Sequence, residues 1–380
     1  MTDGGRPSIA RDRPVIVLLG GPSAEHDVSV VSGTAIAEAL ADDGFRVEPV
    51  LIDLDGSWWF LPADHRRSGR PASAYDAPRA LGARGPVSLG HAVARLAERT
   101  DEPIVFIALH GPFGEDGTIQ AVFEAVGLPY TGAGVAASAL GMDKALFKRM
   151  CRGLGLPVVD WREIRATRWA ADRPGVRAEL RAFAIGAEDP RLMIKPAGLG
   201  SSVGMTLVHD ASQLDGALDL AFRYDEVALA ESYLAGARDL EVSVIGNDPA
   251  RLAIFGPGEI VSGHEFYDYA AKYTPGLSET STRAEVSEAQ RALLHKLSRD
   301  VYRAIGAEGF ARIDFLVTED RVVVSEINTI PGFTPISLFP TMPAEAGHDF
   351  VDVCRWILAL AVERHAARSR SRLTASDLPR

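Results

Sequence analysis

Cysteine is scarce in this sequence, because Cys151 and Cys354 are the only two among 380 residues. They lie far apart, in segments that we expect to be helical, so the sequence does not indicate a disulfide framework. Long apolar runs are also missing. None approaches the roughly 18 residues of a membrane-spanning helix, and no charged-then-apolar leader precedes Val15. We therefore expect a cytoplasmic protein without a membrane span.

Lysine is rare as well, since only five of the 40 basic residues are lysine, and the formal net charge is −11. This acidic balance argues against general binding to nucleic acids or acidic membranes, which need basic patches. Three of the five lysines lie in the motifs described below, where a mobile point charge suits a phosphate group. At 380 residues, the chain is long enough for two or three domains.

Strands and helices alternate in the first third of the sequence. The expected strands cover 14–19, 45–52 and 104–109, and the expected helices cover 28–43 and 118–126. This alternation predicts an α/β fold with a doubly wound parallel sheet, whose ligands bind beyond the carboxyl ends of the strands. Glu25 and His110 lie at such ends. The alternative is that each is only a helix-start or packing residue, and the pattern leaves both readings open.

A glycine-rich loop follows an expected strand near the middle of the chain. Leu192–Lys195 reads as a strand that ends in lysine, and the segment 198–204 contains three glycines and two serines. The N–H and hydroxyl groups of such a loop can surround triphosphate oxygens, although many glycine-rich hairpins bind nothing. The loop is not a Walker A motif, because GxxxxGK[ST] is absent.

Two further segments are open to a nucleotide-binding reading. Lys144 and Lys148 lie four residues apart on one face of an expected helix, which normally indicates a solvated face, and we interpret Lys148 as a surface residue. The run 227–234 contains Glu231 and precedes another expected strand, 240–246. The first run is either an edge strand that offers its backbone and Glu231 to an adenine, or half of an ordinary strand pair. The polar and aromatic segment 264–276 is a candidate lid over the substrate.

The segment 312–328 reads as an antiparallel hairpin, with a turn at 318–320. Side chains alternate faces along a strand, so Arg312 and Asp314 share one face of the first strand, as Glu326 and Asn328 do on the second. Carboxylate and amide oxygens form a hard site that suits Mg²⁺, and the arginine suits anionic oxygens. The alternative is a solvated polar face. Gly332, in the loop that follows, lets a backbone N–H approach a ligand closely.

Six motifs occur in a fixed order along the chain: GGPSAEHDVSVVSG (20–33), LHGPFGEDGTIQ (109–120), GMDK (141–144), KPAGLGSSVGM (195–205), FYDYAAKY (266–273) and RIDF with EINTIPGFTPISL (312–338). Together they resemble the ATP-grasp carboxylate–amine ligases and, within them, the D-alanine–D-alanine ligases, over about Val15 to Arg355. The sequence departs from the family at Asp239, where a glutamate is usual. It departs again after Thr274, in a segment that bears on the choice of acceptor.

The resemblance implies an ATP-grasp fold, in which an N-terminal doubly wound parallel-sheet domain precedes two α+β domains that clamp ATP. The expected domains are 14–133, 134–230 and 231–366, between tails at 1–13 and 367–380. A final helix is expected at 349–362. The resemblance also implies a homodimer.

The resemblance further implies a role for individual residues. Two Mg²⁺ ions, with Mn²⁺ as the alternative, are expected at Asp314, Glu326 and Asn328. The expected ATP site consists of Lys144, Lys195, Gly200, Ser201, Ser202, Glu231, Ser232, Tyr233, Leu234, Asp239 and Lys272. The expected D-alanine sites consist of Glu25, His110, Tyr273, Arg312, Gly332, Ser337 and Leu338. Catalysis is expected to use Glu25, Ser201, Tyr273, Arg312 and Gly332.

The activity implied is the ATP-dependent ligation of two D-alanines through a D-alanyl phosphate, for peptidoglycan precursors. Such a mechanism needs no enzyme nucleophile, and no Ser-His-Asp or Cys-His arrangement stands out in the sequence. Two alternatives stay open. One is the same scaffold with another acceptor, such as D-lactate, D-serine or an amino acid of a specialised pathway. The other is a nucleotide-binding regulatory protein without catalysis.

Overall fold

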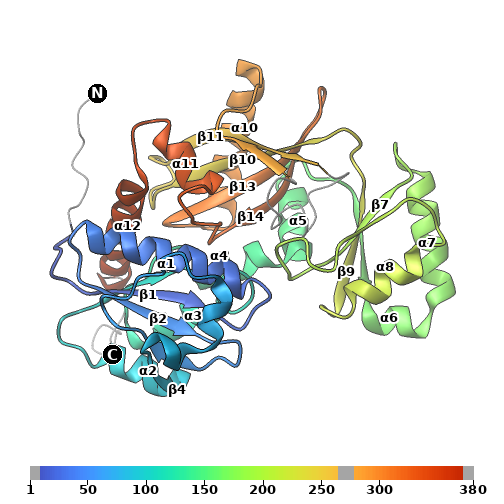
Figure 1. Ribbon diagram of the computed structural model, residues 1–380. Helices are drawn as coiled ribbons and strands as arrows, with labels where there is room; N and C mark the ends of the chain where they lie inside the picture. The colour runs from blue at the N-terminus through green and yellow to red at the C-terminus, as the bar shows by residue number, and fades with distance from the viewer. Residues whose placement is uncertain (1–8, 264–277, 371–380) are drawn as a thin grey trace, which may run out of the picture.

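The computed structural model describes residues 9–263 and 278–370, and these residues form three β-sheets (Figure 1). The strand orders are β4-β3-β2-β1-β5 in the N-terminal sheet, β6-β9-β7-β8 in the central sheet and β12-β11-β10-β13-β14 in the C-terminal sheet. The expected site residues Lys272 and Tyr273, and the expected lid, lie outside the described residues.

The middle of the N-terminal sheet is parallel. β1 (Val15–Gly20) pairs in parallel with both β2 (Val47–Ile52) and β5 (Ile104–Ile107). Two short strands, β3 (Trp58–Phe60) and β4 (Arg84–Val87), extend the sheet in the antiparallel sense. The predicted doubly wound parallel sheet is therefore confirmed for its core. The antiparallel extension had no counterpart in the prediction, because 58–89 is rich in Pro, Gly and Arg and shows no period.

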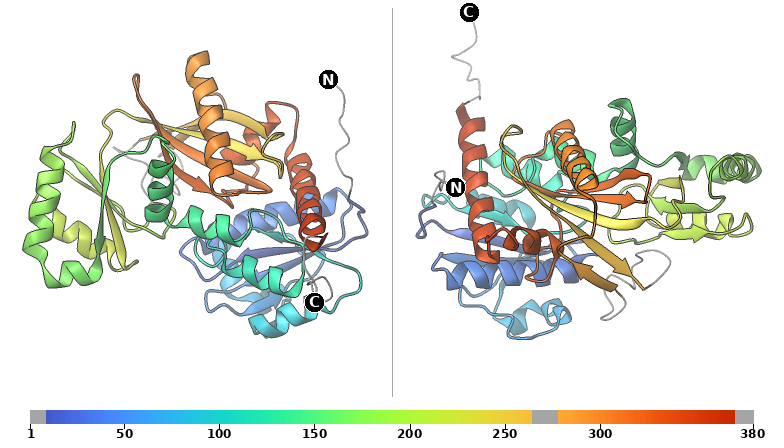
Figure 2. Two further views of the ribbon diagram at one scale, coloured as in Figure 1. Left: turned by 180° about the vertical axis from the view of Figure 1, so that it is seen from behind. Right: turned by 90° about the horizontal axis from the view of Figure 1, so that it is seen from above.

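Helices cover both faces of the N-terminal sheet. Val15 and Val17 face a core shared with α1 (His26–Asp42) and α12 (Phe350–Arg370). Ile16 and Leu18 face a core shared with α2 (Leu89–Ala97) and α3 (Thr118–Val126). The side chains of β1 alternate between these two cores, so the strand is fully buried, which explains its continuous apolar sequence. Figures 1 and 2 show α1 and α12 side by side near the sheet.

The C-terminal sheet is antiparallel. Its strands are β10 (Arg238–Ile245), β11 (Ala253–Ser262), β12 (Ser278–Ser281), β13 (Phe310–Val317) and β14 (Val322–Asn328). In the β13–β14 hairpin, Arg312 lies opposite Asn328 and Asp314 lies opposite Glu326, so the predicted hairpin is confirmed. The helices that flank the sheet are α4 (Val135–Met142), α5 (Lys144–Gly153), α10 (Glu288–Ala304) and α11 (Leu338–Ala344).

An aromatic cluster joins the N-terminal and C-terminal sheets. The ring of Phe333 lies 5.9 Å from Phe106 in β5, 6.1 Å from Phe310 in β13, 5.4 Å from Phe339 in α11 and 5.4 Å from Phe350 in α12. Phe106, Phe310, Phe333 and Phe339 belong to one buried core, against which Phe350 packs. The two sheets therefore share a continuous apolar interior.

The central sheet has a core of its own and stands to one side of the molecule (Figure 1). Its strands are β6 (Trp161–Arg165), β7 (Leu192–Pro196), β8 (Thr206–Val208) and β9 (Val227–Ser232), covered by α6 (Ala166–Ala171), α7 (Arg173–Ile185) and α8 (Leu214–Ala221). β9 lies between β6 and β7, so it is neither an edge strand nor paired with β10. The edge-strand reading of 227–234 was wrong, because the run pairs as an ordinary strand with β6 and β7, and the expected domain boundary after residue 230 falls inside β9.

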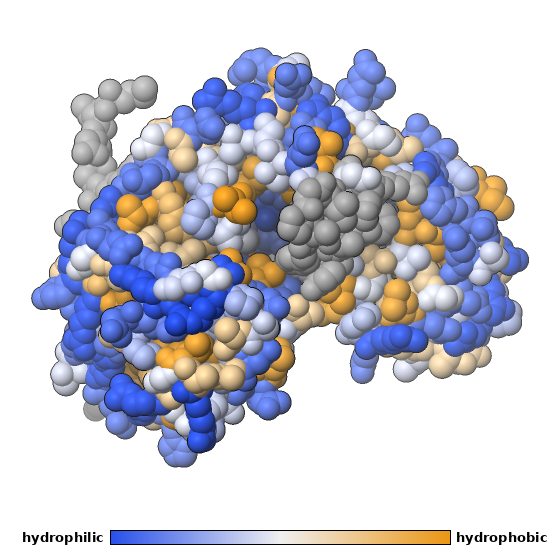
Figure 3. Space-filling view, viewed as in Figure 1, coloured by the Kyte–Doolittle hydropathy of each residue, from blue (hydrophilic) through white to orange (hydrophobic). Residues whose placement is uncertain are grey.

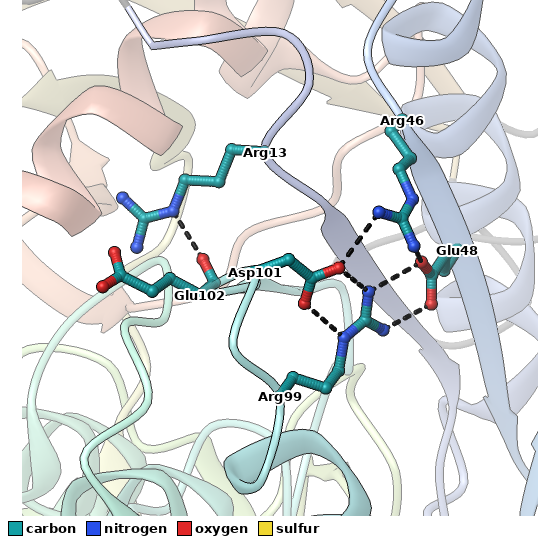
Figure 4. Close-up of polar contacts among 6 residues, drawn as sticks. All are labelled: Arg13, Arg46, Glu48, Arg99, Asp101 and Glu102. Carbon is teal, nitrogen blue, oxygen red and sulfur yellow. Dashed lines mark hydrogen bonds and ion pairs between the residues drawn. The ribbon is translucent and has the colours of Figure 1, made fainter.

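An ion-pair network closes the amino ends of the parallel strands (Figure 4). Arg99 donates to Glu48 at 2.6 and 2.9 Å and to Asp101 at 2.8 Å, and Arg46 contacts the same two carboxylates at 3.0 Å. The hydrogen bond from Arg99 lowers the pKa of Asp101 to about 2. The network lies at the opposite ends of the strands from Glu25 and His110, where it links the segments entering β2 and β5.

The last helix is longer than predicted. α12 runs to Arg370, well past the expected end at Val362. The buried Arg364 donates to the carbonyls of Tyr130, at 2.8 Å, and Gly132, and Arg368 pairs with Glu124. These contacts hold the polar end of the helix on the N-terminal domain. Within 9–263 and 278–370, no helix combines the length and the apolar character needed to cross a membrane.

Candidate active site

A cleft between the central and C-terminal sheets gathers most of the predicted nucleotide residues, and the space-filling view shows a recess near the centre of the molecule's face (Figure 3). We call it the central cleft. The predicted residues that line it are Lys144, Lys195, Gly200, Ser201, Ser202, Glu231, Ser232, Tyr233, Leu234, Asp239, Arg312, Asp314 and Glu326. Five strands from two sheets, the start of α5 and the loops after β7 and β9 bring these side chains together.

The glycine-rich loop has an unusual backbone where it faces the central cleft. Ser201 and Ser202 have φ of 51° and 57°, in the left-handed region that side chains other than glycine rarely adopt. Such strain persists only where the surroundings impose it, and it is common in loops that bind ligands. The ammonium of Lys144 donates to the carbonyl of Leu199 at 2.7 Å, which ties the loop to the start of α5.

The hairpin end of the central cleft alternates positive and negative groups. Arg312 makes two hydrogen bonds of 2.7 Å to Asp314 and lies 3.2 Å from Glu241. The amide of Asn328 donates to Asp314 at 2.9 Å, and Lys144 lies 3.1 Å from Glu326. Each carboxylate of the hairpin is thus held by a cation.

These pairs determine the charges in the site. Burial alone would lower the pKa of Arg312, but the carboxylates of Asp314 and Glu241 raise it well above the ordinary value. Burial likewise opposes the charge of Lys144, but Glu326 raises its pKa. Both cations stay charged at neutral pH.

A second cluster of charges surrounds Glu231, which lines the central cleft. It includes Lys148, and here the structure corrects the interpretation of that residue. This lysine is fully buried, and its ammonium lies 3.1 Å from Oε1 of Glu231. Lys195 lies 3.0 Å from the same oxygen. The prediction that Lys148 is a solvated surface residue is wrong, because β9 packs over the helix face that carries it.

Glu25 joins the N-terminal domain to the glycine-rich loop. The hydroxyl of Ser201 donates to its carboxylate, so two members of the predicted set of Glu25, Ser201 and Tyr273 are in contact. Gly111 and Gly200 pack against the same carboxylate. An added Cβ at Gly111 would overlap Glu25 Oε2, and one at Gly200 would lie 2.9 Å from it. Two loops therefore enclose Glu25 so closely that a side chain at either glycine would displace its carboxylate.

His110 and Glu115 link the N-terminal domain to the loop after β14. His110 contacts the carbonyl of Ile330 at 2.8 Å and the hydroxyl of Ser32 at 2.9 Å. Glu115 accepts hydrogen bonds from the N–H groups of Gly111, at 2.7 Å, and Ile330, at 2.9 Å. Burial lowers the pKa of His110 and raises that of Glu115 to about 8. The contacts of His110 and Glu115 with Ile330 thus fix the start of the loop that carries Gly332.

The remaining predicted residues lie just beyond the described lining of the central cleft. Gly332 lies beside Ser337, whose hydroxyl accepts a hydrogen bond from the N–H of Thr334 at 3.0 Å. Leu338 begins α11 and packs against Ile260, which lines the central cleft. The structure therefore brings this loop next to the hairpin without placing its side chains in the cleft.

Three buried charged residues were missing from the predicted site. Glu115 lies inside a motif that we had singled out, but only its contacts across the domains reveal a role. Glu241 faces Arg312 from the neighbouring strand β10, and Lys148 faces Glu231. Alternation along β10 could have placed Glu241 beside Asp239, two residues earlier on the same face. Nothing in the sequence indicates what covers Lys148.

Comparisons with known proteins agree with this arrangement. The family model described as D-ala D-ala ligase N-terminus matches residues 14–133, and the one described as D-ala D-ala ligase C-terminus matches residues 150–359. The chain is 37% identical over 369 residues to a D-alanine–D-alanine ligase of Chlorobaculum tepidum, an alignment that covers 93% of this chain and 97% of that protein.

Solved structures give the same result. The D-alanine–D-alanine ligase of Coxiella burnetii superposes with a TM-score of 0.78 at 29% identity, over 95% of this chain and 97% of that one. A D-Ala:D-Ser ligase of Enterococcus faecalis superposes with a TM-score of 0.77 at 28% identity, over 92% and 99%. The predicted ATP-grasp fold and family resemblance are confirmed, and the chain belongs to the D-alanine–D-alanine ligase family.

Proposed function

We propose that this protein ligates two D-alanines to D-alanyl-D-alanine, with ATP converted to ADP and phosphate, for the synthesis of peptidoglycan precursors. The observation that carries the proposal is the central cleft, which brings two lysines, Lys144 and Lys195, and a strained glycine-rich loop to the carboxylates of one hairpin. A carboxylate is a poor acyl donor, so the γ-phosphoryl group of ATP first converts it to an acyl phosphate. The amine of the second D-alanine then attacks, and phosphate leaves.

In this proposal Lys144 and Lys195 bind the ATP phosphates, and Ser201, Ser202 and Gly200 offer loop groups to the same oxygens. The base and ribose lie against 231–234 and Asp239, which line the same central cleft. Neutral and cationic donors in a site that excludes water stabilise the charge that develops on phosphoryl transfer. Lys272 completes the phosphate contacts in the proposal.

Three hairpin residues fit a pair of Mg²⁺ ions. Asp314 and Glu326 face each other across the hairpin, and Asn328 is adjacent, so the donors are oxygens on neighbouring positions. Within the part of the chain that the structure describes, no three His, Cys, Asp or Glu side chains gather as a complete cage. This fits Mg²⁺, which is usually held by one or two carboxylates together with substrate phosphates. When bound, the ions, or Mn²⁺ in their place, would neutralise phosphate charge.

The amino-acid sites are proposed at the junction of the N-terminal domain and the loop after β14. Glu25 and His110 orient the first D-alanine, whereas Ser337 and Leu338 lie beside the second. Arg312 and the Gly332 N–H steady the oxyanion of the tetrahedral intermediate. Glu25, Ser201 and Tyr273 act as a hydrogen-bonded set that ties the loops over the substrates, and the bond between Glu25 and Ser201 supports two of its members.

A second candidate is ligation of D-alanine to D-serine, because a D-Ala:D-Ser ligase superposes nearly as well as a D-alanine–D-alanine ligase. Purified protein with ATP and Mg²⁺ would be offered D-alanine alone, then D-alanine with equimolar D-serine or D-lactate. Phosphate release and product mass are measured. D-alanyl-D-alanine as the main product in every mixture supports the proposal, and no ATP-dependent product from any mixture contradicts it. We further propose a cytoplasmic homodimer, which light scattering can test.

A further inference from the structure

Three charged side chains form a closed cluster behind the base-binding end of the central cleft. Lys148, Glu231 and Lys195 are exposed by only 0%, 5% and 5%. Lys148 comes from α5, Lys195 from the end of β7 and Glu231 from β9. Lys195 and Glu231 line the central cleft, whereas Lys148 does not. Lys148 therefore can influence a bound nucleotide only through its neighbours.

Burial of the charged Lys148 side chain costs folding free energy. Burial lowers its pKa, and the charge of Glu231 opposes that effect. Its ammonium finds no hydrogen-bond acceptor of good geometry among the described residues, and the ring of Trp161 lies 6.0 Å away. Buried ion pairs rarely stabilise a fold more than apolar side chains of the same volume would. Stability alone is therefore a poor reason for a lysine at this position.

The geometry of the pair shows what Lys148 does to Glu231. Both ammoniums approach the same oxygen, Oε1, at 3.1 Å from Lys148 and 3.0 Å from Lys195. Although burial alone would raise the pKa of Glu231, the two lysines lower it, so the carboxylate stays charged. Oε1 thus lies close to two cations, and the Glu231 side chain lines the central cleft, where a bound ligand can meet the carboxylate.

We propose that Lys148 is a positioning residue for recognition of the nucleotide base: it fixes the Glu231 carboxylate so that this group accepts a hydrogen bond from an exocyclic amino group. The inference rests on the proposed ATP-dependent function and deepens it. An adenine offers such a donor. A 6-oxo purine presents a carbonyl oxygen there instead, which the carboxylate repels. Lys148 also supplies a second positive charge, so that Glu231 does not neutralise Lys195 toward phosphate.

The test compares ATP with ITP, which carries an oxo group where ATP carries the amino group. In Lys148→Met the side chain stays unbranched and is one atom shorter, but it loses the charge, and Glu231 keeps only Lys195. We expect the ratio of kcat/KM for ATP over ITP to fall about 10- to 100-fold, the size of one hydrogen bond to a charged group. The KM for D-alanine should change little. Lys296→Met, which alters an exposed lysine paired with Asp300, is the matched control and should leave the ratio unchanged.

A double variant separates positioning from a general structural role. If Lys148 acts through Glu231, Lys148→Met should lower the ATP/ITP ratio in the wild-type background and leave it unchanged in a Glu231→Gln background. Equal losses with ATP and ITP would overturn the proposal, whatever happens to thermal stability. Lys148→Gln carries the same comparison if Lys148→Met does not fold, and failure of both to fold would assign Lys148 a purely structural role.

Binding measurements distinguish this inference from the proposed function. Thermal-shift titrations with ADP and IDP report base selectivity without turnover. Preference of the wild type for ADP, lost in Lys148→Met, would support the positioning role even if no ligation were detected. Equal affinity of the wild type for ADP and IDP would overturn it, even if the protein proved to be an active ligase.

Discussion

Replacement of Gly111 by alanine tests whether the position of Glu25 controls D-alanine binding. Gly111 has φ of +77°, and an added Cβ would overlap Glu25 Oε2. Alanine in the left-handed region costs about 1–2 kcal/mol. The overlapping atom is the end of a flexible side chain, so the carboxylate, rather than the backbone, is expected to move. Glu25 would then lose its contact with Ser201 and its alignment with substrate.

The expected kinetic effect follows from that displacement. A hydrogen bond to a charged group contributes about 1.5–3 kcal/mol, so kcat/KM for D-alanine should fall about 10- to 150-fold while the KM for ATP changes less. Gly127→Ala is the matched control, because Gly127 has φ of +73° and no atom within 4 Å of an added Cβ. Both variants should lose similar stability in urea unfolding.

Steady-state phosphate release, measured as a function of D-alanine and then of ATP, decides the outcome. The backbone strain is common to both variants, so any difference in kcat/KM between them reports on Glu25. If Gly111→Ala and Gly127→Ala show the same kinetics at matched stability, the reasoning about Glu25 is refuted. A crystal structure of Gly111→Ala with an unmoved Glu25 would refute it independently.

Four further predictions concern other parts of the site. Glu326→Gln should lower kcat at least about 100-fold without unfolding the protein, and near-native turnover at ordinary Mg²⁺ would remove the two-metal proposal. Lys195→Ala should raise the KM for ATP and slow turnover, by a rough 2–4 kcal/mol in kcat/KM, and unchanged ATP kinetics would contradict its phosphate role. Burial lowers the pKa of His110, so the folded protein binds its proton less tightly than the unfolded chain. Stability from this group is present above about pH 6.5 and is lost as pH falls toward the lowered pKa. His110→Gln should therefore flatten the decline in unfolding free energy on acidification, and an unchanged slope would exclude this cause. Finally, the proposal assigns the acceptor site a tyrosine, Tyr273, whose phenol sets no positive charge against the D-alanine ammonium, so D-alanyl-D-alanine should dominate over D-alanyl-D-lactate at pH 6 and pH 8. Depsipeptide as the main product at pH 6 would contradict it, and Tyr273→Phe should raise the second-site KM.

Local patterns predicted the parts of the fold that depend on neighbours in sequence. Alternation placed Asp314 opposite Glu326 because a two-residue period and a short turn define a hairpin register. The apolar run at 15–19 identified the buried strand because a strand that is covered on both faces is apolar throughout. In contrast, β4 is held by pairing with β3 across more than 20 intervening residues, and the residues of β3 and β4 show no period.

Contacts between distant segments explain what the sequence did not reveal. Lys148 lies four residues after Lys144, and helix periodicity says only that the two share a face, not which sheet covers it. One of the two N–H groups that donate to Glu115 belongs to Ile330, more than 200 residues away. The six motifs nevertheless contain roughly half of the residues that line the central cleft, among them Lys144, Lys195 and Glu326.

The aromatic cluster around Phe333 has a consequence for how nucleotide enters. Its rings fasten the sheet that carries Glu25 and His110 to the sheet that carries Arg312 and Asp314. These two sheets cannot slide past each other without exposing the apolar core that they share, so we expect them to move together as one rigid unit. The central sheet has a separate core, carries the glycine-rich loop and forms the other side of the central cleft. Because Ser201 in that loop already donates a hydrogen bond to Glu25, we expect any movement of the loop on nucleotide binding to be transmitted directly to the proposed amino-acid site.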